Sequence, residues 1–186
     1  MSSVTGTSPA RETYPPALIA IHWLTVLLIA AVFATIELRE YFPKGDVMRD
    51  QLKSLHFMLG LTVWLLVLAR LVLRSRERTP QIVPPPSAWQ MGAAHVMHAL
   101  LYAVMIAMPV LGWLVLSGEG KPVPFFGLTL PPLMPENKAL AHSIEDVHVF
   151  IGNAFYYLIG FHALAALAHH YLSKDNTLVR MLPMIR

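Results

Sequence analysis

Four long apolar stretches, separated by polar or proline-rich segments, dominate the hydrophobicity pattern of this chain. We expect helices over residues of about 17–36, 55–73, 93–116 and 144–172. Each stretch approaches or exceeds the roughly 20 residues that a helix needs to cross a bilayer core of about 30 Å. Pro15 and Pro16 mark the start of the first helix, and Pro109 predicts a kink in the third. The pattern predicts an all-α fold, a four-helix transmembrane bundle that forms one integral membrane domain over residues 1–186.

Composition supports a membrane protein and narrows its chemistry. Of the 186 residues, 55% are hydrophobic and only 13% are charged, whereas soluble domains carry about 25% charged residues. Cysteine is absent, which excludes disulfides, iron–sulfur clusters, thiolate zinc sites and covalently attached c-type haem. Residues 1–14 are polar and the first apolar run reaches full membrane length, so we expect a retained anchor and assign no function to Met1–Tyr14.

Basic residues are concentrated in the connector after the second span and in the C-terminal tail. They are Arg70, Arg74, Arg76, Arg78, Lys174, Arg180 and Arg186. The 37–53 loop balances its charges, and the 117–146 loop is net acidic. Because short cytoplasmic loops carry an excess of Lys and Arg, we expect both termini to be cytoplasmic and these two loops to lie on the outer side.

Four of the nine histidines lie within the spans, at two depths: His22, His56, His148 and His162. An ionisable residue inside a membrane span is a functional-site hypothesis by default. His148 and His162 are 14 residues apart, which separates them by about 21 Å along a helix and about 40° around it. One face of the fourth helix therefore offers one ligand near each leaflet. His56 matches the outer depth, and His22 is nearest the inner depth.

Imidazole pairs on facing helices are suited to low-spin b haem, whose iron then carries electrons and binds no oxygen. Gly60, Gly152 and Gly160 lie near these histidines, and a missing side chain lets a porphyrin edge approach the backbone. Zinc or another transition metal is an alternative, because histidine is its commonest ligand. Transport sites, however, gather intramembrane carboxylates near the midplane, and these spans carry almost no Asp or Glu. We therefore predict two non-covalent haem groups, one at each depth.

Five further histidines lie near helix ends or in a loop: His95, His98, His142, His169 and His170. His169 lies seven residues beyond His162 and so shares its face. His169, His98 and His95 are candidates to bind a quinone head group by hydrogen bonds and to supply protons. Interfacial polarity at helix ends is an equally good alternative. We expect His142 to be structural or solvated.

Short motifs surround the histidines and follow the last helix. They are Ile21-His22-Trp23, Leu55-His56 with Gly60, Phe125–Pro131, Gly160-Phe161-His162-Ala163, His169-His170-Tyr171 and Lys174-Asp175-Asn176-Thr177-Leu178. On these motifs, the chain from about Pro16 to Pro183 resembles the bacterial cytochrome b561 family, and within it the membrane-bound superoxide oxidases. The block from His162 through the Lys-Asp-Asn-Thr tail is the most specific part of the resemblance.

The resemblance implies a four-helix bundle with two bis-histidine b haems. His56 and His148 would ligate the outer haem, and His22 and His162 the inner one, which are also the pairs that depth predicts. It further implies a multi-pass protein of the bacterial inner membrane that passes electrons from periplasmic superoxide through the haems to ubiquinone. No partner protein and no nucleic acid is required by this reading.

Basic residues near the outer haem would raise the local concentration of superoxide, a small anion. Arg49 and Lys53, within two turns before His56, are the expected capture residues, with Lys44 and Lys138 as further candidates. Two other functions remain open at this point. One is an electron-transfer subunit that links a dehydrogenase or hydrogenase to quinone, and the other is a non-enzymatic metal-handling protein.

Overall fold

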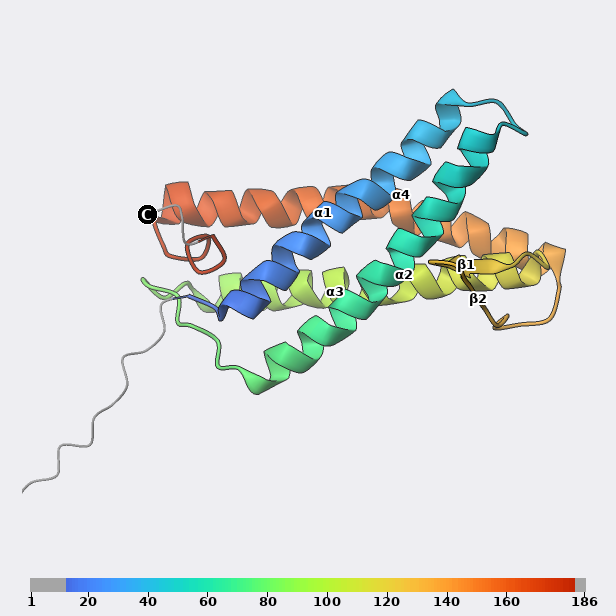
Figure 1. Ribbon diagram of the computed structural model, residues 1–186. Coiled ribbons are helices and arrows are strands. Elements are labelled where there is room, and N and C mark those ends of the chain that lie inside the picture. Colours follow the sequence, from blue (N-terminus) through green and yellow to red (C-terminus); the bar gives the residue numbers. More distant parts are fainter. Residues whose placement is uncertain (1–12, 183–186) are drawn as a thin grey trace, which may run out of the picture.

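Four long helices make up most of the computed structural model of the protein, which describes residues 13–182 (Figure 1). They are α1 (Pro16–Leu38), α2 (Val47–Arg76), α3 (Ala88–Gly118) and α4 (Lys138–Ala168). All four are long and apolar enough to cross a membrane, which confirms the four expected spans. A short 3-10 turn, η1 (Arg39–Tyr41), follows α1, and a π-helical turn, η2 (His169–Ser173), extends α4. Residues 1–12, most of the segment Met1–Tyr14, lie outside the described residues, as does Arg186.

Each helix is longer than the apolar stretch that predicts it, and polar capping residues begin α2, α3 and α4 outside the hydrophobic run. The Asp46 carboxylate accepts a hydrogen bond from the Met48 amide at 2.7 Å and so begins α2. The Asn137 side chain accepts from the Leu140 amide at 3.0 Å and begins α4. α3 begins at a capping box and runs without interruption through Pro109.

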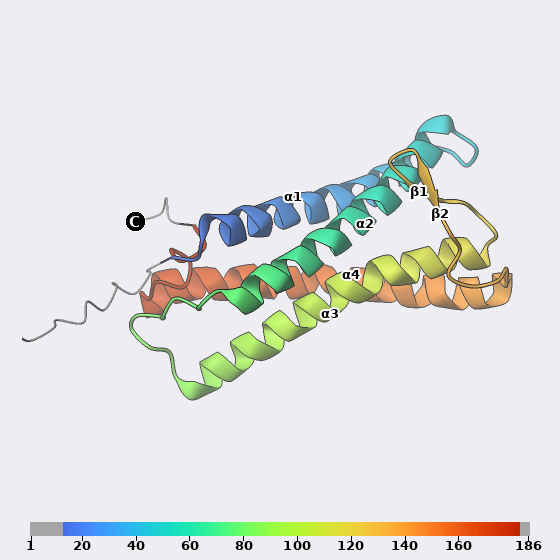
Figure 2. The same ribbon diagram turned by 60° about the horizontal axis from the view of Figure 1, so that its bottom comes forward.

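The helices pack as two pairs, α1 along α2 and α3 along α4, with α2 also contacting α3 (Figures 1 and 2). A buried apolar cluster holds the pairs together at the middle of the bundle. Its members are Val63, Val67, Leu101, Met105 and Phe155. These residues fall between His56 and Arg70 on α2, between His98 and Gly112 on α3, and between His148 and His162 on α4. The core therefore separates the two ends of the bundle. We call this cluster the central apolar layer.

A two-stranded hairpin interrupts the expected all-α fold. Strands β1 (Val123–Phe125) and β2 (Leu128–Leu130) pair antiparallel, with Val123 opposite Leu130. The turn residues Phe126 and Gly127 have φ of 45° and 86°, the two positive values that a type I′ turn requires. Val123 and Phe125 pack on α2 and α3 with Leu61 and Leu116, whereas Phe126 is exposed. The hairpin lies beside α2 and α3 at one end of the bundle (Figure 2).

The C-terminal tail folds back onto the end of the bundle where both described chain ends lie. Lys174 adopts a left-handed conformation, with φ of 54°, and ends the helical segment. Asn176 bonds to the backbone of Gln81 and Val83 in the connector between α2 and α3. Trp23 donates from Nε1 to the Met181 carbonyl at 2.9 Å. We call this the terminal end, and the opposite end, which carries β1 and β2, the hairpin end.

Candidate functional site

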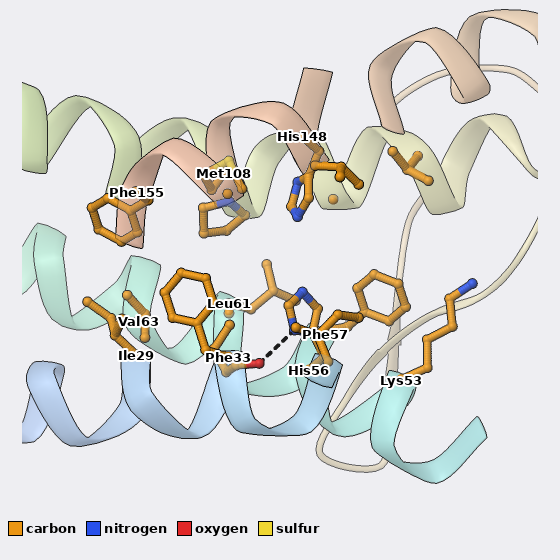
Figure 3. A pocket seen from close by; sticks show the side chains of 18 of the residues that line it. Ile29, Phe33, Lys53, His56, Phe57, Leu61, Val63, Met108, His148 and Phe155 are labelled. Atoms are coloured by element: carbon orange, nitrogen blue, oxygen red, sulfur yellow. Dashed lines mark hydrogen bonds between the residues drawn. The ribbon is translucent and has the colours of Figure 1, made fainter. Parts of the chain in front are cut away.

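A cavity of about 330 Å³ opens between the four helices toward the hairpin end. Figure 3 shows His148 of α4 reaching into it from one wall and His56 of α2 from the facing wall. Their ring centroids are 6.3 Å apart, with the ring planes inclined by 69°. The structure thus brings together the two histidines that the sequence predicts as the outer pair.

The ring of His56 is oriented by the first helix. Its Nδ1 lies 3.0 Å from the backbone carbonyl of Val32. Because a carbonyl can only accept, Nδ1 carries the proton, and the lone pair is left on Nε2. A metal-binding histidine normally donates its other ring N–H to such an acceptor. The Nδ1 of His148 is buried and makes no well-formed hydrogen bond among the described residues, although the Met108 carbonyl lies close by.

The separation of the two rings fits one metal ion held from both sides. Zinc, a guide to such distances, binds histidine nitrogens at about 2.0–2.1 Å. With each nitrogen about 1 Å from its ring centre, one metal between two imidazoles holds the ring centroids roughly 6 Å apart. The observed 6.3 Å agrees with that arrangement.

Glycines open the walls of this cavity. A Cβ built on Gly60 would meet no atom within 4 Å, and one on Gly152 would meet only the Met108 methyl at 3.5 Å. A Cβ on Gly112 would lie 3.5 Å from Cε1 of His148. Gly60 and Gly152 were expected at the site from their spacing to the histidines, whereas Gly112 on α3 was missed. The cavity thus has two facing imidazoles, apolar walls and glycines that leave its walls open. These features fit a flat macrocycle whose iron would lie between the two rings.

Charges of both signs line the mouth of the cavity. Lys53 borders it, with its Nζ 5.9 Å from the Phe57 ring centroid (Figure 3). The carboxylates of Glu37, Glu40 and Glu145 line the same opening. Arg39 also lines the cavity but donates to the Glu40 carboxylate at 2.7 Å. The basic side chains of the entrance are therefore Lys53 and Arg39, and they do not extend around the whole rim.

Arg49, the other expected capture residue, has a different position. Its guanidinium donates to the carbonyls of Arg39 and Phe42 at 3.0 and 2.8 Å and contacts the Glu40 carboxylate at 3.2 Å. It does not border the cavity. These contacts hold the turn between α1 and α2 together.

A second group of histidines lies nearer the terminal end. The rings of His98 and His162 are 5.4 Å apart at their centroids, and His22 interacts electrostatically with both. The Nδ1 of His22 is buried without a hydrogen-bond partner among the described residues. The structure therefore places His98, expected at a separate quinone site, at the same level as the predicted inner pair.

The other quinone candidates are separate from this group. His169 Nδ1 lies 2.5 Å from the Asp175 carboxylate in the tail. Burial alone would raise the pKa of Asp175, but the hydrogen bonds from Thr177 and His169 outweigh it and hold that pKa below its ordinary value. His95 is exposed on α3, and His142 is exposed near the hairpin end, as expected.

Within residues 13–182, no three His, Asp or Glu side chains gather closely enough to hold one metal ion. Structural and catalytic zinc sites need three or four protein ligands. Axial ligation of a haem iron needs only two. The grouping of the histidines therefore favours a macrocycle over the transition-metal alternative.

Comparisons with known proteins agree with this geometry. The prokaryotic cytochrome b561 family model matches residues 13–184. The chain is 42% identical over 165 residues to cytochrome b561 homolog 1 of Escherichia coli (strain K12), covering 89% of this chain and 94% of that relative. It is 40% identical over 176 residues to the probable superoxide oxidase CybB of Yersinia pestis, covering 95% and 99%. It is 28% identical over 172 residues to cytochrome b561 homolog 2 of Escherichia coli (strain K12), covering 92% of each. With the four membrane helices and paired histidines, these matches establish that the chain belongs to the prokaryotic cytochrome b561 family.

Proposed function

We propose that this protein is a superoxide oxidase that transfers electrons from periplasmic superoxide, through two bis-histidine b haems, to ubiquinone. As a cytochrome b561 family member it is a multi-pass inner-membrane protein of electron transport, and the family binds haem b. The facing imidazoles of His56 and His148 across the cavity are the observation that carries the proposal. The name of the Yersinia pestis relative supports superoxide as the electron donor.

The reaction balances as a one-electron donor feeding a two-electron acceptor. Two superoxide ions are oxidised to two molecules of oxygen, and one ubiquinone takes up the two electrons and two protons to become ubiquinol. When bound, the two haems would supply one-electron carriers, held by the imidazoles of His56 and His148 and of His22 and His162. In this proposal the hairpin end faces the periplasm and both termini face the cytoplasm, as the distribution of basic residues favours.

At the hairpin end, His56 and His148 hold the outer haem, and the Val32 carbonyl sets the tautomer of His56. Lys53 borders the opening and attracts the superoxide anion locally, against the neighbouring carboxylates. Arg49 serves this entrance indirectly, by holding the turn that precedes α2.

At the terminal end, His22 and His162 hold the inner haem, and His98 lies against His162 as the nearest further polar ring. Ubiquinone binds beside this level, with His98, His169 and His95 as its candidate polar partners. The hydrogen bond between His169 and Asp175 joins two ionisable side chains where α4 passes into the tail. Protons for the quinone therefore enter from the terminal end.

The test is to add superoxide to the purified protein, with and without ubiquinone, and to follow haem absorbance. We expect split α-bands from two haems, fast reduction by superoxide and catalytic quinol formation. Reduction only after a dehydrogenase or hydrogenase is added would favour the electron-transfer subunit. A colourless protein with stoichiometric zinc would favour metal handling, and either result would overturn the proposal.

A further inference from the structure

Arg70 is a charged residue inside the second membrane helix. It is half-buried on α2, and its guanidinium carbon lies 5.8 Å from the Tyr102 ring centroid. No described carboxylate, within residues 13–182, forms an ion pair with it, and the groups that act on its charge are Tyr102, Tyr14 and Arg74. A charge at this depth is costly unless it has a partner. Within the part of the chain that the structure describes, this charge is therefore left without an anion.

The helical register places Arg70 at the level of the inner histidines. Arg70 follows His56 on α2 by 14 residues, the same spacing that separates His148 from His162 on α4. Equivalent pairs occur on the other two helices, His22 with Ile36 on α1 and His98 with Gly112 on α3. The four members nearer the hairpin end line its cavity: Ile36, His56, Gly112 and His148.

The four members nearer the terminal end form a second level about 21 Å away along each helix. They are His22, Arg70, His98 and His162. Arg70 interacts electrostatically with His22, His98 and His162, as expected if all four face the same space. Where the hairpin end has His56 on α2, the terminal end has a cation. One wall of the inner level is therefore positively charged.

We propose that Arg70 binds a propionate carboxylate of the haem at the terminal end. This inference rests on the haem placement in the proposed function. A guanidinium matches a carboxylate with two parallel hydrogen bonds, which suits a haem propionate better than a point charge would. Arg74, one turn further toward the terminal end on the same helix, adds positive charge but already donates a hydrogen bond to the Thr79 hydroxyl at 2.6 Å. Arg70 has no such hydrogen bond among residues 13–182, so we assign its guanidinium to the ligand.

The test compares haem retention in three proteins, each with two ligands. Wild type and Arg70→Gln are each reconstituted with haem or with haem dimethyl ester, whose propionates cannot ionise, and transfer to apomyoglobin is timed. Arg76→Gln is the matched control, because Arg76 is exposed on the same helix. We expect Arg70→Gln to speed loss of the terminal-end haem by about tenfold or more, the value of a charge-assisted hydrogen bond. Esterification should likewise speed the loss of this haem from wild type and from Arg76→Gln. It should add little to the loss from Arg70→Gln.

Equal acceleration by esterification in all three proteins would overturn the inference, since the propionates would then be bound elsewhere. An effect of Arg70→Gln that appears only in vesicles with anionic phospholipid would also overturn it and would point to a lipid phosphate. If Arg70→Gln does not fold, Arg70→Lys with both haems provides the test, and the retained hairpin-end haem reports that the variant is folded. The protein could show the expected dependence of haem loss on Arg70 and on the propionates and still not be reduced by superoxide. That result would refute the proposed function but not the pairing of Arg70 with a propionate.

Discussion

Replacing Gly60 by leucine should show whether the space beside Gly60 is simply empty or is occupied by haem. A Cβ at Gly60 meets nothing within 4 Å, so the haem-free protein can accept the larger side chain. Replacing glycine inside a helix by a better helix former should stabilise the haem-free fold by about 0.5–1 kcal/mol. If a porphyrin occupies the same space, the leucine overpacks it at a cost of about 1–3 kcal/mol. That cost corresponds to a loss of haem affinity of roughly 5- to 150-fold.

The assay pairs thermal unfolding of the haem-free protein with haem content and reduced-minus-oxidised spectra after reconstitution. Gly92→Leu is the matched control, because Gly92 is also helical and open but lies on the exposed surface of α3, away from the cavity. Gly60→Leu should lose the hairpin-end haem and keep the other, whereas Gly92→Leu should keep both. Two haems with unaltered spectra in Gly60→Leu would refute the assignment of this space to a macrocycle.

Three other predictions concern the entrance, the inner level and the tail. Lys53→Gln should slow superoxide capture roughly twofold, the effect of one unit charge at about 10 Å in water, whereas Arg49→Gln should mainly lower stability, by about 1–3 kcal/mol. His22→Ala should remove the terminal-end haem, whereas His98→Ala should leave it bound, as judged by haem content. The lowered pKa of Asp175 means that its carboxylate stabilises the fold fully above the ordinary value of about 4, and that this contribution is lost as the pH falls through the lowered value. Asp175→Asn should therefore unfold at a lower temperature than wild type at pH 7, and the difference should close in acid.

Each of these predictions has an outcome that contradicts it. The Lys53 effect should shrink as salt is added, and Lys138→Gln, an exposed residue paired with Glu136 at 3.3 Å, should have a smaller effect; equal slowing would remove Lys53 from the entrance. Loss of haem in His98→Ala with retention in His22→Ala would exchange their roles. A stability difference for Asp175→Asn that persists below pH 3 would show that its role does not depend on charge.

Membrane spans and the histidine pair at the hairpin end could be predicted from the sequence, because both follow from spacing along single helices. Runs of apolar residues set the spans, and depth alone matched His56 to His148. Contacts between helices could not be predicted in the same way. The sequence gives the distance of His98 from the end of its helix, and on that basis it was expected at a quinone site. It does not tell which face of α3 points toward the other helices.

The hairpin and the role of Arg49 were missed for local reasons. The turn at Phe126 and Gly127 needs two positive φ values, and a phenylalanine in the first position is not one of the residues that usually mark such a turn. Arg49 was read only as a charge, although its donors are used by backbone carbonyls. Side chains that serve the backbone are invisible in a charge pattern.

The central apolar layer has a consequence for energy conversion. A chain that relays protons needs water or hydroxyl groups. The buried side chains of this layer offer neither: they are Val63, Val67, Leu101, Met105 and Phe155. Electrons can tunnel across such a barrier, whereas hydrogen ions cannot follow them. If quinone is reduced at the terminal end with protons from that side, each turnover moves negative charge inward across the insulating layer, so that detoxification of superoxide would also charge the membrane.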